Sequence, residues 1–112
     1  MKPFSGLMAF CVLLATLASV GVAASVQDNW EKNCTDCHGQ NGRSQTRLGR
    51  KSGAPDLTDP KRQAKLTDED AFRGIKFGRK NSKGEEKMDA FGQILSDREI
   101  TELVAFVRTL AK

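Results

Sequence analysis

The sequence predicts an all-α domain. Several stretches place apolar residues at the spacing of a helix face, and two long segments that contain glycine separate them. No stretch shows the sustained alternation of apolar and polar residues that a half-buried strand carries. With 112 residues, 38% of them hydrophobic and 29% charged, the chain is sized for one domain and is neither a membrane bundle nor a disordered tail.

The N-terminal segment has the pattern of an export signal. Lys2 precedes residues 6–24, which are uncharged and rich in leucine, valine and alanine, and small residues lie just before Ser25. We therefore expect a cleaved signal peptide over residues 1–24 and a domain over residues 25–112. The alternative is an uncleaved membrane anchor, because the apolar run approaches the roughly 20 residues that span a bilayer.

Four helical pieces are expected after this segment. Ser25 is a possible N-cap of the first, and Thr67 and Ser96 each precede an acidic residue by three positions, as in a capping box. Asp59-Pro60 opens the shortest piece, because proline suits the first position of a helix. The last piece carries an apolar stripe with a period near 3.6. The expected bounds are residues 26–37, 59–66, 67–77 and 96–110.

Two long segments, residues 39–58 and 78–95, join these helices. Loops of this length are unusual in a small compact domain. Aromatic residues make up only 6% of the chain, which is little material for a core. Both observations indicate that the loops wrap around a bound group that supplies part of the buried apolar area.

One motif carries recognisable chemistry. Loss of the signal would remove Cys11, and the two remaining cysteines and the one histidine all lie in Cys34-Thr35-Asp36-Cys37-His38. This is the C-x-x-C-H pattern of covalent haem c attachment. Two thiols three residues apart on a helical turn reach the two vinyl groups of one haem, and the next residue falls beneath the iron as an axial ligand.

Other uses of the motif fit the sequence less well. A structural zinc site needs four ligands, and only three are present after the signal. A redox-active C-x-x-C pair is expected in a βαβ context, which the chain lacks. A plain disulfide between Cys34 and Cys37 would close a very short loop and leave the adjacent His38 without a role.

Elimination gives the second axial ligand. No other histidine exists, and Met1 and Met8 leave with the signal, so Met88 is the one methionine of the exported chain. Met88 lies between Lys87 and Asp89 in a polar segment, where a methionine that only fills a core is out of place. Ligation by His and Met occupies both axial positions, which favours electron transfer and predicts that the protein is not an enzyme.

With these residues the chain resembles the class I c-type cytochromes, the small bacterial monohaem kind. The resemblance implies a cytochrome c fold, in which the N- and C-terminal helices cross and long loops wrap around one covalent haem. It implies that Trp30 packs against Phe106, and that the backbone carbonyl of Pro55 accepts the imidazole N–H of His38. Members often have Met-Pro-x-Phe at the distal ligand, whereas this chain has Met-Asp-Ala-Phe at residues 88–91.

The missing proline predicts a less restrained distal loop, in which Lys87 or Lys83 could replace Met88. The function implied is periplasmic, respiratory electron transport by a monomer with one iron-containing haem c. Membrane redox complexes or other periplasmic redox proteins would be its donor and acceptor. Two alternatives stay open: a haem c subunit of a larger respiratory oxidoreductase, and a haem-based gas or redox sensor.

Charge is informative about partners. The net charge of +4 falls to +3 when Lys2 is removed, and the signs are mixed, which is unlike a nucleic-acid-binding protein. Basic residues near the expected haem edge are candidates for docking to an acidic partner. These candidates are Arg47, Arg50, Lys51, Arg79, Lys80, Lys83 and Lys87.

Overall fold

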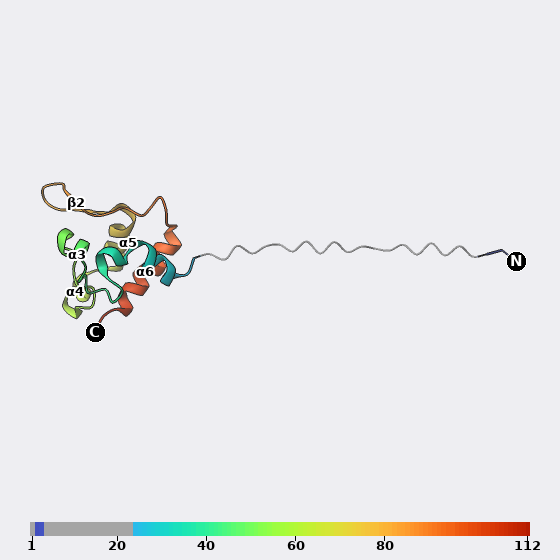
Figure 1. Cartoon of the computed structure of the whole chain (residues 1–112), viewed down its shortest axis with the longest axis horizontal. Coiled ribbons are helices and arrows are strands. Elements are labelled where there is room, and N and C mark those ends of the chain that lie inside the picture. Colours follow the sequence, from blue (N-terminus) through green and yellow to red (C-terminus); the bar gives the residue numbers. More distant parts are fainter. Residues whose placement is uncertain (1, 4–23) are drawn as a thin grey trace.

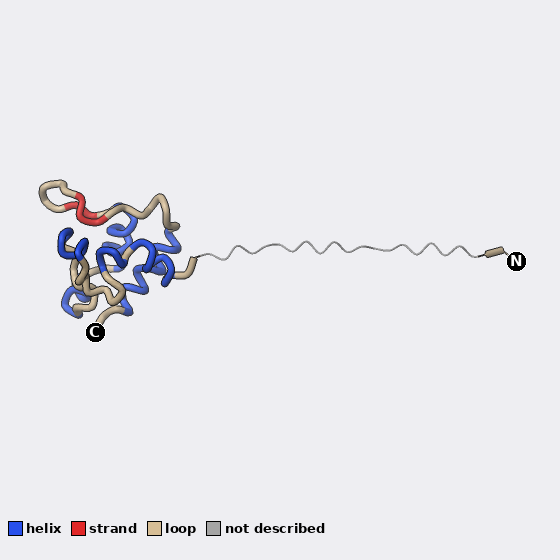
Figure 2. The backbone as a smooth tube through the Cα atoms, viewed as in Figure 1, coloured by secondary structure: helices blue, strands red, loops and turns tan. Residues whose placement is uncertain are grey.

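Six helices and one two-stranded hairpin make up the described part of the chain, residues 2–3 and 24–112, in a computed structural model (Figures 1 and 2). None of the helices in this part is both long and apolar enough to cross a membrane. The signal predicted over residues 1–24, with Met1, Met8 and Cys11, lies almost wholly outside the described residues, so its cleavage stays a prediction. In chain order the elements are α1 (Val26–Asn33), α2 (Thr35–His38), α3 (Arg47–Ser52), α4 (Pro60–Lys65), α5 (Asp68–Phe77), β1 (Arg79–Lys80), β2 (Glu86–Met88) and α6 (Asp97–Thr109).

The all-α prediction is confirmed, and the helices begin close to the expected residues. Ser25 and Ser96 form complete capping boxes, in which the serine hydroxyl and the acidic side chain each accept a backbone N–H of the other residue. Thr67 accepts the N–H of Asp70 without the return bond. The first helix is shorter than predicted, because a distorted Cys34 (φ −116°) separates α1 from α2.

Two elements were not predicted, α3 and the β1–β2 hairpin. The helix α3 has six residues and no apolar stripe, and its limits are set by its ends: the Thr46 hydroxyl accepts the N–H of Gly49, and Gly53 adopts a left-handed conformation with φ +73°. The strands have two and three residues, too few to show an alternating pattern. Periodicity therefore could not reveal either element.

The core forms where α1 packs on α6. Trp30, Ile100 and Leu103 are at most 1% exposed, and the rings of Trp30 and Phe106 lie 5.0 Å apart between centroids. This confirms the aromatic contact that the family resemblance implied. A hydrogen bond of 2.8 Å from the Asn29 amide to the Glu99 carboxylate joins the same two helices. The N- and C-terminal helices, α1 and α6, thus form the packed pair at the centre of the core.

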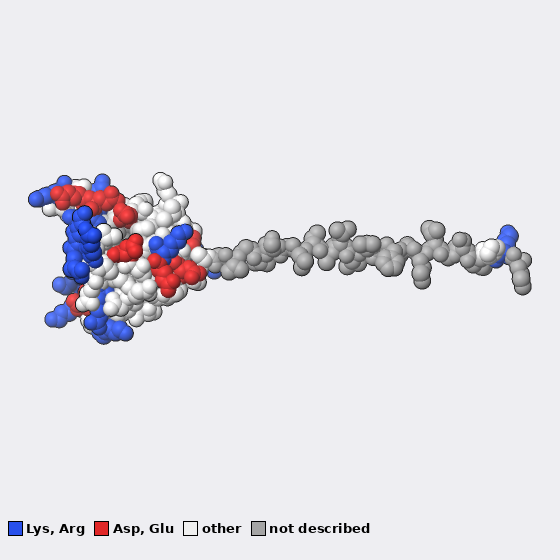
Figure 3. Space-filling model, in the orientation of Figure 1, with Lys and Arg blue, Asp and Glu red and all other residues white. Residues whose placement is uncertain are grey.

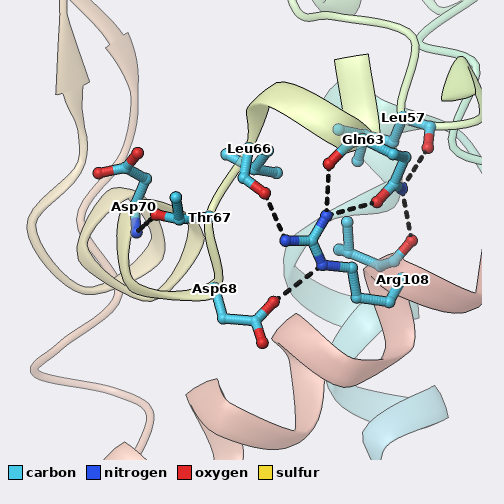
Figure 4. Close-up of polar contacts among 8 residues, drawn as sticks. Leu57, Gln63, Leu66, Thr67, Asp68, Asp70 and Arg108 are labelled. Carbon is cyan, nitrogen blue, oxygen red and sulfur yellow. Dashed lines mark hydrogen bonds and ion pairs between the residues drawn. The ribbon is translucent and has the colours of Figure 1, made fainter. Parts of the chain in front are cut away.

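Arg108 of α6 joins α4 and the start of α5 to this pair of helices (Figure 4). Its guanidinium donates to the backbone carbonyl of Gln63 at 2.7 Å, to the Gln63 side-chain oxygen at 3.0 Å, and to the Leu66 carbonyl. It also pairs with Asp68 at 2.8 Å. The Gln63 amide in turn donates to the Leu57 carbonyl at 2.7 Å. One side chain therefore satisfies two backbone carbonyls at the C-terminal end of α4.

Replacing Arg108 by alanine should lower the free energy of unfolding of the haem-loaded protein by about 2 kcal/mol, because several acceptors lose a charged donor. Chemical denaturation measures this loss. Arg98→Ala is the control, since among the described residues Arg98 forms an ion pair with Glu102 alone and its side chain is 89% exposed; it should cost at most about 0.5 kcal/mol. Equal losses for the two variants would contradict the role assigned to Arg108.

Candidate functional site

All five residues predicted for the site line one cavity of about 1280 Å³. They are Cys34, Cys37, His38, Pro55 and Met88. Its lining residues include members of the α1–α2 segment, of the chain after α3, and of the hairpin. Its apolar wall, which the sequence analysis did not assign, includes Leu57, Leu66, Ala71, Ile75, Leu103 and Val107. The apolar positions of α5 and α6 were the available signal, but the sequence alone did not show which of them face a cavity.

The attachment segment keeps its helical hydrogen bonds across the break between α1 and α2. The N–H of Cys34 donates to the Trp30 carbonyl, and the N–H of His38 donates to the Cys34 carbonyl, both at 2.9 Å. Both cysteines are free thiols, Cys34 buried and Cys37 half-buried. Burial raises the pKa of the Cys34 thiol to about 11, and the nearby Cys37 adds to the rise. The Cys34 thiol is therefore protonated at neutral pH.

His38 lies beside Trp30, with ring centroids 6.0 Å apart and planes inclined by 29°. Burial lowers the pKa of its imidazole, which favours the neutral form that binds a metal. Its Nδ1 atom is buried, and no described residue is its hydrogen-bond partner. A buried ring nitrogen without a partner is unusual in a folded domain, and this one keeps its capacity to donate or accept a hydrogen bond.

The hydrogen bond expected between His38 and Pro55 is not formed. The Pro55 carbonyl instead accepts the Ser44 hydroxyl at 2.5 Å, while His38 Nδ1 has no partner among the described residues. A carbonyl oxygen has two lone pairs, so the bond from Ser44 leaves one available. Ser44 was not identified from the sequence, because no local sequence pattern marks a serine that donates a hydrogen bond to a carbonyl eleven residues away.

Thr46 and Gly49 support the attachment segment from α3. The Thr46 hydroxyl lies 2.7 Å from the carbonyl of Asp36 and 3.0 Å from that of Cys37. Gly49 packs so closely that a Cβ atom there would lie 2.3 Å from the Cys37 carbonyl. Both residues were missed in the sequence. The glycine inside a run of basic residues was the one signal of this close approach.

The hairpin carries Met88. Its strands β1 and β2 are antiparallel, with Arg79 opposite Met88. Met88 is half-buried and packs against the hydrophobic core. Gly78, with φ +77°, lets the two strands approach, because a Cβ there would lie 2.6 Å from the Met88 carbonyl.

The segment after Met88 is tied to the end of α5. The N–H of Phe91 donates to the Ile75 carbonyl at 2.9 Å, and the N–H of Gly92 donates to the Lys76 carbonyl at 3.0 Å. These bonds restrain the loop that lacks the family's proline. Lys87 lines the cavity and pairs with Glu85 at 3.6 Å. Replacement of Met88 by a lysine stays a prediction.

The seven docking candidates are all exposed. Figure 3 shows lysine and arginine side chains along the side of the molecule formed by α3, α4 and the hairpin. The three cations of α4 were not among these candidates, and all three line the cavity. We call this surface the basic edge; it comprises Arg47, Arg50, Lys51, Lys61, Arg62, Lys65, Arg79, Lys80, Lys83 and Lys87.

These residues fit covalent haem c. Two free thiols, an imidazole and a thioether line the same cavity, and the buried His38 Nδ1 lacks a partner among the described residues. Within the described part of the chain, no group of three or more His, Cys, Asp or Glu side chains is arranged to hold a metal ion by itself. Two thiols, an imidazole and a thioether are the groups that the C-x-x-C-H pattern and a distal methionine supply to haem c.

Comparison with known proteins points in the same direction. The family model described as "Cytochrome C oxidase, cbb3-type, subunit III" matches residues 21–107. The solved structure of the KustC0563 c-type cytochrome is 30% identical, with a TM-score of 0.69 over 80% of this chain and 100% of that chain. A tyrosine-to-phenylalanine mutant of Kustc0563 is 30% identical, with a TM-score of 0.66 over 78% of this chain and 99% of that chain. No curated protein matches the chain.

Proposed function

The chain belongs to the c-type cytochrome family represented by the subunit III model of cbb3-type cytochrome c oxidase, and from this premise we propose that it is a periplasmic carrier of single electrons with one haem. Members of this family bind haem c covalently, so haem-based electron transfer is the chemistry of the chain. The observation that supports the finer proposal is the convergence of Cys34, Cys37, His38 and Met88 on one cavity.

When bound, haem c supplies reversible one-electron chemistry at its iron. Cys34 and Cys37 would hold the group through thioethers, and His38 and Met88 would be the two protein ligands of its iron. Because side chains then take both axial positions, no position stays open for a substrate, which favours a carrier over an enzyme. The apolar side chains of the cavity wall, among them Leu57 and Leu103, exclude water from the redox centre.

The test is a visible absorption spectrum with the intact mass, on protein exported in a host that matures haem c. The expected result is a low-spin c-type spectrum, one covalent haem on a chain beginning at Ser25, and the weak far-red band of a Met–iron bond. A high-spin spectrum or carbon monoxide binding at neutral pH would favour a sensor. Absence of covalent haem would overturn the proposal, and a retained N-terminus would replace cleavage by anchoring.

We propose that the basic edge docks an acidic redox partner. Six of its ten cations line the haem cavity, Lys51, Arg62 and Lys87 among them. Charge complementarity of this kind raises the association rate more than the affinity. The docking would therefore bring the partner close to residues that line the haem cavity.

The rate of electron transfer to an acidic partner should fall with added salt, on the order of tenfold or more between low and physiological ionic strength. Stopped-flow kinetics measures it. The Arg50→Glu and Lys51→Glu variants should be slower and less dependent on salt. Arg98→Glu makes the same change of charge outside the basic edge and should leave the rate near that of the wild type. A flat salt dependence would indicate an apolar docking surface instead.

A second candidate function is a haem c subunit of a larger respiratory oxidoreductase. The matching family model describes a subunit of an oxidase, which favours this function. Affinity purification from solubilised membranes of the native source separates the two. Stoichiometric recovery of a large partner subunit would support the subunit function, and recovery of the chain alone would support the free carrier.

A further inference from the structure

Arg79 of β1 reaches back across α5. Its Nη2 atom donates to the backbone carbonyl of Asp70 at 2.9 Å. The guanidinium also lies on Gly74, where a Cβ atom would come within 2.5 Å of Nε, 2.6 Å of Nη2 and 2.8 Å of Cζ. Gly74 is buried inside a helix, where glycine costs about 1 kcal/mol relative to alanine. We call this contact of the Arg79 guanidinium with Asp70 and Gly74 the Arg79 seat. It gives a physical reason for a glycine at position 74, because a larger side chain would displace the guanidinium.

Arg79 is also the cross-strand partner of Met88. The two residues stand opposite each other in the antiparallel register, so their side chains project from the same face of the hairpin. Both line the cavity. The hairpin is short, and an isolated two-stranded hairpin is at best marginally stable in water. Its position therefore depends on contacts with the rest of the domain, and the Arg79 seat is one of them.

We propose that Arg79, seated on Gly74, is a positioning residue that holds the hairpin against α5 and keeps Met88 at the iron. This inference rests on the proposed function, because it takes Met88 as the axial ligand. The guanidinium acts here through the geometry of its contacts with α5. Its charge alone, as a partner for a haem carboxylate, would be a different role, and the experiment below separates the two.

The experiment measures imidazole affinity of the ferric, haem-loaded protein, because imidazole binds in the state from which Met88 has left. Arg79→Ala should raise this affinity about tenfold by increasing the population of that state. Gly74→Ala should do nearly the same, since its methyl group displaces the guanidinium while the positive charge stays. The far-red band of the Met–iron bond should weaken in both variants.

Two controls accompany these variants. Arg73→Ala removes a cation next to Gly74 that packs over Phe77 and does not line the cavity, and it should leave imidazole affinity unchanged. The double variant Gly74→Ala/Arg79→Ala should match Arg79→Ala, because both substitutions remove the same contact. Additive effects would show that Gly74→Ala acts on α5 by itself, which overturns the proposed seat.

Other outcomes also decide the inference. If Gly74→Ala behaves as the wild type while Arg79→Ala changes the reduction potential, the role of Arg79 is its charge and the positioning role is wrong. If neither variant changes imidazole affinity, the positioning role is again wrong, although the carrier proposal stands. A wild-type protein without the far-red band overturns the ligand assignment itself, and that failure is visible before any variant is made.

Discussion

Replacing Met88 by alanine is expected to lower the reduction potential of the haem-loaded protein by roughly 0.2 V, about a quarter of the range over which axial ligands set haem potentials. A thioether ligand raises the potential, and its removal also vacates one axial position. The reduced variant should therefore bind carbon monoxide at neutral pH, which the wild type should not do. Potentiometric titration and carbon monoxide difference spectra measure the two effects.

Met88→His is the matched control for this variant. A histidine at the same position of β2 restores a second axial ligand, so the protein should stay low-spin and should not bind carbon monoxide. Its potential should nevertheless be low, because the thioether is gone. A far-red Met–iron band that persists in Met88→Ala would contradict the assignment of Met88.

The second large effect concerns the cysteines. The Cys34→Ala/Cys37→Ala double variant should carry no covalent haem and should show no cooperative thermal unfolding. The reason is the size of the cavity, about 1280 Å³, on whose walls most of the apolar contacts with haem are expected. Engineered cavities of about 150 Å³ already cost several kcal/mol, and a whole domain is stable by only about 5–15 kcal/mol.

Circular dichroism and thermal melting of the exported double variant measure this loss. Cys34→Ala alone keeps the thiol of Cys37 and should retain haem through one thioether, with a cooperative transition at lower temperature. A double variant that melts cooperatively near the wild-type temperature would show that the polypeptide core is sufficient without the haem.

The predictable part of the fold rests on local signals. The capping residues Ser25 and Ser96 and the apolar stripe of the last helix are patterns within one turn or one helix face, so the sequence reveals them directly. The attachment motif is likewise local. The contact of Trp30 with Phe106 is not local, and the family resemblance supplied it before the structure confirmed it.

The parts that could not be predicted depend on tertiary contacts. Ser44 and Pro55 are joined by a hydrogen bond across a loop, whereas the bond expected from His38 to the same carbonyl is not formed. The β1–β2 hairpin has strands too short to show periodicity, so its register, which places Arg79 opposite Met88, follows from packing on α5. Sequence patterns show which residues favour a helix or a strand, whereas these arrangements depend on contacts between separate elements.

Charged side chains are unevenly distributed over the face shown in Figure 3. Lysine and arginine gather on the side of α3 and α4, whereas acidic side chains lie near the start of α1 and also on the hairpin beside its lysines. An acidic partner of the kind proposed above would therefore exert a torque on the approaching protein and turn the basic edge toward itself before contact. Because α1 begins on the side of the molecule away from α3 and α4, a chain cleaved before α1 and a chain tethered there would present the same surface to that partner (Figure 1).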